Sequence, residues 1–292
     1  MGPLPARPKE RTLTILQAIV LGITQGVTEF APISSSGHLI IVPWLFDWPI
    51  LTNPDLNKTF DVALHIGTLV GALVYFRHDV ARYAAAWLRS IGARRIDTTE
   101  QRLAWALVIG TIPAVIAGAT LESFIQDELG QPWLIAIMLV VFGIVLYVVD
   151  RVMAARRHLE DLVVRDGLIL GVAQAIALQP GVSRSGVTMT AARALTFDRE
   201  TAARFSFLLS LPVIAGAGLY KGAEVASEGI PAGMAGPFVA GMIASAVSGF
   251  LVIAFLLRYL RRHDFALFMW FRIAVAALIF IVIASGARPA TI

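Results

Sequence analysis

Six long apolar runs recur along this chain, and they limit its fold more strongly than any other feature of the sequence. The runs cover residues 62–76, 103–121, 133–149, 205–220, 237–257 and 266–284. A helix needs ~20 predominantly apolar residues to cross the hydrocarbon core of a bilayer, and several runs approach that length. Only 15% of the residues are charged, whereas a soluble domain carries roughly 25%. The sequence therefore predicts an all-α, polytopic transmembrane helical bundle, with residues 1–292 in a single membrane domain.

The charged residues divide the connecting loops into two kinds. Arginine is concentrated in loops 77–102, 151–166 and 258–264, whereas loops 122–132 and 222–235 contain acidic residues and no arginine. Because basic loops usually lie in the cytoplasm, the first three are expected inside and the other two outside. This explains the net charge of +4 without nucleic acid, which is not expected as a partner. Three basic residues near the N-terminus disagree, because the same path places them outside: Arg7, Lys9 and Arg11.

Two segments are expected to enter the membrane and return to the same side. Residues 167–195 lie between basic loops, so this segment should enter from the cytoplasm as a pair of short helices. The break falls at Gln179-Pro180-Gly181, because proline and glycine end helices. Residues 15–45 lie three crossings earlier and would form a second re-entrant pair from the outside, broken at Ala31-Pro32.

Residues 21–37 and 170–186 align at a constant offset of 149 positions. The identical pairs are Leu21/Leu170, Gly22/Gly171, Gln25/Gln174, Ser34/Ser183, Ser36/Ser185 and Gly37/Gly186. Chance similarity between apolar segments is the simpler explanation, but three of the six identities fall in Ser-x-Ser-Gly and favour duplication. Copies inserted in opposite orientations form an inverted-topology repeat, whose site lies where the broken helices meet. We expect the first repeat at 12–150 and the second at 165–285.

The first break is surrounded by polar residues. They are Gln25, Glu29, Ser34, Ser35, Ser36 and His38. Residues 25 and 29 are four apart and therefore share one helical face. An ionisable Glu at membrane depth is costly and usually faces a polar cavity or partner. The serines fall at the start of the following helix, where hydroxyls cap the helix and backbone N–H groups are free.

The second break has the same design with an arginine added. It carries Ser183, Arg184, Ser185 and Thr188. Backbone amides at a helix start, hydroxyl groups and a guanidinium together form an anion site, and phosphate is a natural occupant. Two such helix starts that face each other would hold two phosphate groups. The pair therefore predicts a site the size of a pyrophosphate, with a carboxylate and an imidazole beside it.

Each of these residues also has a simpler structural interpretation. The serines could act only as helix caps, and Glu29 could be a buried acid paired with Arg184. His38 could be a packing histidine, and the paired glutamines could hydrogen-bond between helices. His65, a polar exception inside an apolar run, could equally support the site or only pack. The joint occurrence of Glu, His, Arg and hydroxyl groups in two matched breaks favours a functional site.

The two motifs resemble the signature motifs of the undecaprenyl-pyrophosphate phosphatases, a family often named for bacitracin resistance. The matching segments are Gln-Gly-Val-Thr-Glu-Phe-Ala-Pro-Ile-Ser-Ser-Ser-Gly-His at 25–38 and Pro-Gly-Val-Ser-Arg-Ser-Gly-Val-Thr at 180–188. The resemblance covers nearly the whole chain. It implies a multi-pass plasma-membrane enzyme that removes one phosphate from undecaprenyl pyrophosphate, giving the carrier lipid for peptidoglycan. It further implies a divalent cation, Mg²⁺ or Ca²⁺, and a site open to the outer side.

By position, the resemblance assigns the acid and metal ligand to Glu29, the imidazole to His38 and the hydroxyl to Ser35. Arg184 completes the expected catalytic group; substrate binding falls to Gln25, Ser34, Ser36, Ser183, Ser185 and Thr188. Position 25 is Gln here, where many members have Glu, which weakens any scheme with two carboxylates on the metal. The nucleophile stays open between Ser35 activated by His38 and a water activated by Glu29 or His38.

The rival prediction is a lipid-phosphate transporter or flippase, since inverted repeats with broken helices are also a transporter architecture. The pair of Glu29 and His38 favours the enzyme, because a carrier needs charge compensation but no acid–base couple. The expected partners are undecaprenyl pyrophosphate and membrane lipid. Whether the chain forms a homodimer stays open, because the sequence does not determine an oligomeric state.

Overall fold

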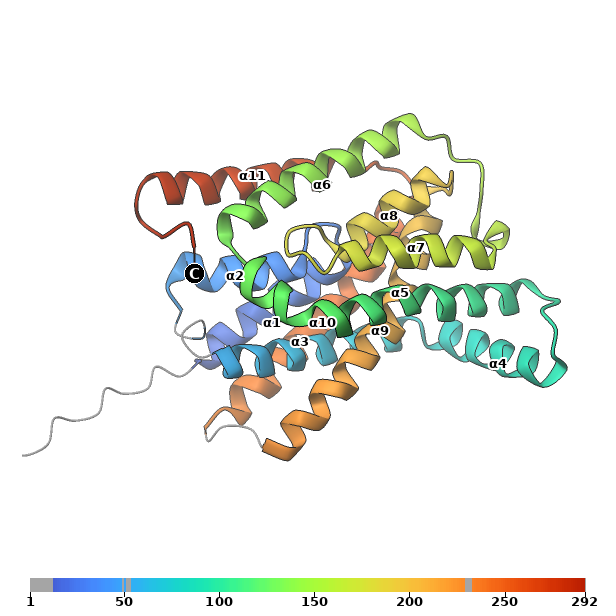
Figure 1. Ribbon diagram of the computed structural model, residues 1–292, viewed down its shortest axis with the longest axis horizontal. Coiled ribbons are helices and arrows are strands. Elements are labelled where there is room, and N and C mark those ends of the chain that lie inside the picture. Colours follow the sequence, from blue (N-terminus) through green and yellow to red (C-terminus); the bar gives the residue numbers. More distant parts are fainter. Residues whose placement is uncertain (1–12, 49, 51–53, 229–232, 292) are drawn as a thin grey trace, which may run out of the picture.

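The computed structural model describes residues 13–48, 50, 54–228 and 233–291, and the regular elements in this part of the chain are all helices. Most of the helices run along the long axis of one elongated bundle (Figure 1). Five are long and apolar enough to cross a membrane: α5 (Thr99–Glu128), α6 (Pro132–Val152), α9 (Arg199–Glu228), α10 (Ala235–Tyr259) and α11 (Ala266–Ala284). The prediction of an all-α, polytopic membrane protein is confirmed.

Four shorter helices form the two predicted broken pairs. They are α1 (Ile15–Phe30) with α2 (Ser35–Phe46), and α7 (Val164–Ile176) with α8 (Arg184–Ala194). The longest of them has 16 residues and is about 24 Å long at 1.5 Å per residue. This is shorter than the roughly 30 Å hydrocarbon core, so none of the four crosses a membrane alone. Both breaks lie where the proline residues predict them.

The segment at 77–102 differs from the prediction. It was expected to be a polar cytoplasmic loop, but most of it forms α4 (Arg77–Ala93), which meets α3 (Pro54–Tyr75) at a bend of 83°. The buried residues of α4 include Tyr83, Ala86 and Ser90, spaced three and four apart on one helical face. The high arginine content of the whole segment favoured a loop, although a narrow apolar face is enough for a helix to pack.

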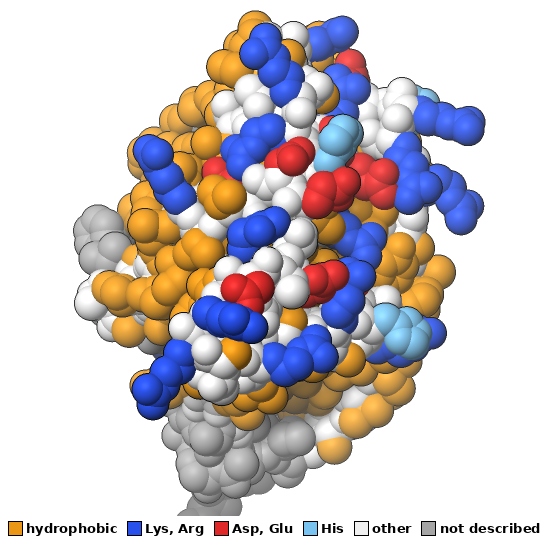
Figure 2. All heavy atoms as spheres, turned by 90° about the vertical axis from the view of Figure 1, so that its right-hand side faces the viewer, with side chains coloured by type: hydrophobic (Ala, Val, Ile, Leu, Met, Phe, Trp, Pro, Cys, Tyr) orange, Lys and Arg blue, Asp and Glu red, His pale blue; other side chains and the backbone are white. Residues whose placement is uncertain are grey.

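The basic loops gather at one end of the bundle. Arg151 forms an ion pair with Asp264 at 3.6 Å and Arg261 with Glu200 at 2.6 Å, which joins three connections that are distant in sequence. Figure 2 faces this end: lysine and arginine side chains are spread over it, with hydrophobic side chains around them. The predicted topology requires the basic loops to share one end, and the side of the membrane that they face stays a prediction. Several charges used in that prediction lie outside the described residues or side chains: Arg7, Lys9, Arg11, Glu122, Asp127, Glu128, Glu224 and Glu228.

Each broken pair packs closely against a long helix. A Cβ atom on Gly22 of α1 would overlap the carbonyl oxygen of Gly241 in α10, and one on Gly171 of α7 would overlap that of Gly110 in α5. Only glycine permits these two contacts. Gly22 and Gly171 are one of the identical pairs at the 149-residue offset, so the equivalent residues have equivalent packing. This supports duplication, while the opposite orientation of the copies and their bounds stay predictions.

Candidate active site

The two short helices α2 and α8 begin in the same unusual way. Their N-cap residues, Ser34 and Ser183, have φ angles of 75° and 76°, in the left-handed region that non-glycine residues seldom adopt. Each serine Oγ accepts a hydrogen bond from a backbone N–H three residues on, Gly37 at 3.4 Å and Gly186 at 3.1 Å. Both helix starts are therefore strained and fixed, as is common at functional sites.

The two breaks are hydrogen-bonded to each other. Ser34 Oγ accepts from the backbone N–H of Gly181 at 3.0 Å, and Ser185 Oγ donates to the carbonyl oxygen of Ala31 at 3.0 Å. Each serine motif thus holds the loop of the other motif. The structure brings the two helix starts together, although they are about half the chain apart in sequence.

A buried carboxylate lies at the centre of this junction. Glu29 is 5% exposed and forms an ion pair with Arg184 from the second motif. Its other oxygen accepts hydrogen bonds from Ser35 Oγ at 2.6 Å and from Gln25 Nε2 at 3.0 Å. Arg184 also donates to the carbonyl oxygen of Ser210 at 3.2 Å. Glu29, Ser35 and Arg184 therefore form one connected polar group.

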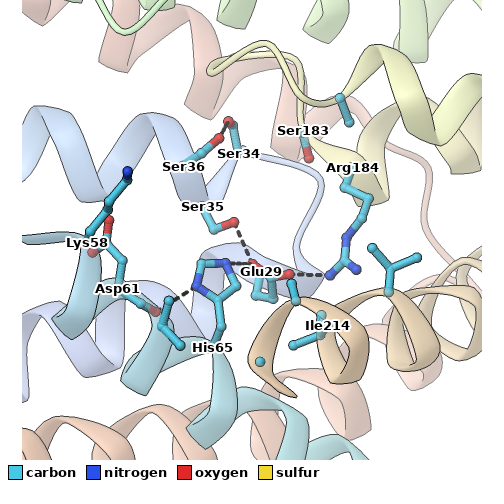
Figure 3. Close-up of a pocket in the computed structure, with 15 residues that line it drawn as sticks. Glu29, Ser34, Ser35, Ser36, Lys58, Asp61, His65, Ser183, Arg184 and Ile214 are labelled. Carbon is cyan, nitrogen blue, oxygen red and sulfur yellow. Dashed lines mark hydrogen bonds and ion pairs between the residues drawn. The ribbon is translucent and has the colours of Figure 1, made fainter. Parts of the chain in front are cut away.

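This polar group opens into a cavity of about 350 Å³. Figure 3 shows Glu29, Ser35 and Arg184 pointing toward one another, with His65 beside Glu29. The lining residues come from both motifs and from α3 and α9: Glu29, Ser34, Ser35, Ser36, Lys58, Asp61, Val62, His65, Ala177, Ser183, Arg184, Val213, Ile214, Ala217 and Gly218. The cavity is polar where the two helix starts meet and apolar along α9.

Helix α3 contributes Lys58 and Asp61, which were not predicted in the site, and His65, for which support of the site and simple packing were both left open. His65 Nε2 lies 3.7 Å from Glu29 Oε2, and its Nδ1 donates to the carbonyl oxygen of Asp61 at 2.8 Å. Lys58 and Asp61 line the same cavity. Positions 58, 61 and 65 are three and four apart, so they form a stripe on one face of the helix. His65, the polar exception inside the apolar run 62–76, was the available sequence signal for this face.

The structure does not bring His38 to the cavity. Its Nδ1 donates to the carbonyl oxygen of Ser34 at 2.7 Å, and its ring stacks on Phe271 of α11 with centroids 5.6 Å apart. The side chain is buried, and it is absent from the described residues that line the cavity. His38 therefore supports the backbone of the first helix start, and an acid–base role for it stays a prediction.

The predicted substrate-binding residues divide into two groups. Ser34, Ser36 and Ser183 line the cavity. The other three, Gln25, Ser185 and Thr188, lie behind it. Gln25 holds Glu29, and Thr188 Oγ1 donates to the carbonyl oxygen of Arg184 at 2.8 Å. These three residues act on the site by positioning the groups that face the cavity.

The side chains in the cavity offer part of a site for a hard divalent cation. Mg²⁺ is typically bound by one or two carboxylates together with oxygen atoms of substrate phosphate. Glu29 and Asp61 supply two carboxylates on the cavity wall, and no group of three or more Asp, Glu or His side chains able to hold an ion occurs among the described residues. The donor set therefore fits a cation that shares its coordination with a bound phosphate.

Comparison with known proteins identifies the relatives of this chain. The family model described as "Bacitracin resistance protein BacA" matches residues 18–278. An undecaprenyl-diphosphatase from Geobacter sulfurreducens is 48% identical over 262 residues, which cover 89% of this chain and 95% of that protein. Enzymes of the same name from Pelotomaculum thermopropionicum and Thermomicrobium roseum are 47% and 45% identical over 94% and 93% of this chain, and over 98% and 99% of their own lengths. The chain, with both of its broken helix pairs, belongs to the bacitracin resistance protein BacA family.

Proposed function

We propose that this protein is an undecaprenyl-diphosphatase, which hydrolyses the terminal phosphate of undecaprenyl diphosphate and releases undecaprenyl phosphate. The observation that carries the proposal is the polar group of Glu29, Ser35 and Arg184 between two helix starts in one cavity. The relatives that bear this enzyme name match nearly the whole chain, and both motifs lie within the matched residues. The chemistry of the site and the name of the relatives therefore support the same function.

Substrate binding falls to the groups that carry positive charge into the cavity. The first-turn backbone N–H groups of α2 and α8 are partly free, and helix N-termini favour phosphate. Arg184 adds a guanidinium at the start of α8, and Lys58 adds an ammonium group on the opposite wall. Phosphoryl transfer depends mainly on positioning and charge neutralisation, which these groups supply.

The geometry favours Ser35 as the nucleophile and Glu29 as its base. Ser35 Oγ already donates to Glu29 Oε2 at 2.6 Å, so its proton passes to the carboxylate as Oγ forms a bond to the terminal phosphorus. The bond between that phosphorus and the bridging oxygen breaks, and its electron pair leaves with undecaprenyl phosphate. Water then attacks phosphorus of the phosphoserine, and the bond between phosphorus and Oγ breaks. Oγ takes back the proton held by Glu29, and inorganic phosphate leaves with the oxygen and protons of the water.

A divalent cation, Mg²⁺ or Ca²⁺, completes the proposed site. Glu29 and Asp61 would hold it, because they are the carboxylates on the cavity wall. When bound, it supplies charge neutralisation for the diphosphate. Gln25 contributes no carboxylate here, and it holds Glu29 through a hydrogen bond of 3.0 Å.

Phosphate release in detergent tests the function directly. Purified protein supplied with undecaprenyl diphosphate should release one inorganic phosphate per lipid, and a chelator should abolish the release until Mg²⁺ or Ca²⁺ is restored. A lipid transporter of the same fold would release none, because transport breaks no bond between phosphorus and oxygen and needs two compartments, which detergent removes. Absence of phosphate release from folded protein would therefore exclude the enzyme.

We place the cavity toward the outer face of the plasma membrane. The basic loops gather at one end of the bundle (Figure 2) and are expected in the cytoplasm, whereas α3 lines the cavity with residues 58–65, near its N-terminus and away from its bend with the arginine-rich α4. The chain has no cysteine, so single cysteines can be labelled without background. Ala217→Cys, in the cavity wall, should react with a membrane-impermeant maleimide in intact spheroplasts. The matched control Ala154→Cys, exposed at the basic end, should react only after permeabilisation. The reverse pattern would place the cavity in the cytoplasm.

A further inference from the structure

The most unusual side chain outside the cavity is Arg272 of α11. It is fully buried, and it is the largest of the described side chains that are. Its Nη2 donates to the carbonyl oxygen of Val182 at 2.7 Å, whereas its Nε and Nη1 have no hydrogen-bond partner among the described residues. None of the ion pairs found in the described part of the chain includes it. Arg272 is therefore a buried cation without a counter-charge.

Packing alone does not explain this residue. An unpaired charge is costly to bury in a membrane protein, and methionine would fill a similar volume without that cost. The neighbouring helices instead make room for the guanidinium. A Cβ atom on Gly143 of α6 would lie 3.0 Å from Arg272 Cδ, and one on Gly186 of α8 would lie 3.0 Å from Nη2.

Arg272 lies directly behind the start of α8. Val182, which accepts its hydrogen bond, is the residue before the N-cap Ser183 and two before Arg184. On the first motif, His38 supports the corresponding N-cap through Ser34, and its ring stacks on Phe271, the residue before Arg272. Arg272 therefore lies behind the N-terminus of α8 and close to His38, which supports the N-terminus of α2.

The charges that line the cavity explain why a cation at position 272 would favour the binding of a diphosphate. The cavity wall carries two cations, Lys58 and Arg184, and two carboxylates, Asp61 and Glu29, so their formal charges cancel although each cation can contact phosphate. A fixed cation behind the α8 N-terminus adds to the positive end of the helix dipole. Its effect reaches the cavity because charges interact strongly in a medium of low dielectric constant.

We propose that Arg272 is a positioning residue for the phosphate group: it holds the loop before α8 through Val182 and supplies buried positive charge behind the helix start that binds phosphate. The proposal rests on the proposed function, because it concerns the same phosphate site. It predicts that the charge at position 272 controls the affinity for phosphate more than it controls folding. The proposed chemical step does not involve Arg272.

Two substitutions of similar length separate charge from packing. Arg272→Met removes the charge and keeps an apolar side chain; Arg272→Lys keeps a charge and a donor for Val182. We expect Arg272→Met to melt at the same temperature as the wild type or higher, because a buried unpaired charge has been removed. Its inhibition constant for inorganic phosphate and its KM for undecaprenyl diphosphate should each rise about tenfold. Arg272→Lys should keep both within about threefold.

The phosphate inhibition constants of the Arg272 variants decide whether the charge at this position acts on the phosphate site. The proposal is overturned if Arg272→Met keeps the phosphate inhibition constant of the wild type, or if Met and Lys weaken it equally. Should the Met variant fail to fold, Arg272→Gln replaces it, since Gln is neutral and keeps a donor for Val182. A wild-type protein that neither hydrolyses the lipid nor responds to phosphate would instead refute the proposed function.

Discussion

The Arg184→Ala variant is expected to lose activity by about 10³-fold or more in kcat/KM, because an arginine that stabilises a transferring phosphoryl group contributes on this scale. It should also be less stable. Removing one partner of a buried ion pair costs about 3–5 kcal/mol, and Glu29 is buried at the junction of the two motifs. Phosphate release and thermal unfolding in detergent would measure the two effects separately.

A double variant shows which effect causes the loss of activity. Glu29→Gln combined with Arg184→Ala removes the stranded charge and should restore most of the stability. Activity should stay absent, because the base and the guanidinium are both missing. The turnover of Arg184→Ala is corrected for the fraction of folded protein. A corrected value near that of the wild type would show that this arginine only neutralises the charge of Glu29.

The Ser35→Ala variant should lose at least about 10³-fold in kcat, since removal of a covalent nucleophile typically costs this much or more. Its folding should change little, because Ser35 is only partly buried and its hydroxyl donates a hydrogen bond to Glu29 alone among the described residues. In the wild type, acid quenching during turnover followed by peptide mass spectrometry should find phosphate on Ser35. Measurement of kcat and of this phosphopeptide tests the covalent step itself.

The neighbouring hydroxyl provides a matched control for this substitution. Ser36 also lines the cavity but lies 3.5 Å from Ser34 Oγ rather than against Glu29. Ser36→Ala should therefore reduce activity several-fold at most and leave the phosphopeptide at Ser35 unchanged. Full turnover by Ser35→Ala would mean that water attacks phosphorus directly.

The parts of the fold that sequence predicts well are those set by local chemistry. Proline and glycine at 32, 180 and 181 locate both breaks, because they end helices whatever lies around them. The serines that follow cap α2 and α8 as expected, and Gln25 contacts Glu29 because residues four apart share a helical face. The length of the apolar runs likewise identifies the five spanning helices found in the described residues, whereas the run at 62–76 lies mostly in α3, which qualifies as a span only together with α4.

The remaining features depend on packing between distant segments. His38 and Ser35 are three residues apart in α2, yet only Ser35 faces the cavity, because α11 places Phe271 against the His38 ring. Lys58, Asp61 and His65 enter the site only because α3 packs beside α1 and α9. The sequence marks His65 as a polar exception in an apolar run, but the contact of this α3 face with the site depends on packing and is seen only in three dimensions.

The ion pair at the junction has a consequence for the synthesis of the protein. Glu29 and Arg184 are 155 residues apart, and a ribosome that adds 5–20 residues per second reaches the second roughly 8–30 s after the first. During this interval α1 must enter the membrane with an acidic side chain that has no guanidinium beside it. A newly inserted first half is therefore an unfinished structure, whose acidic side chain at membrane depth has no cationic partner until the second motif is made.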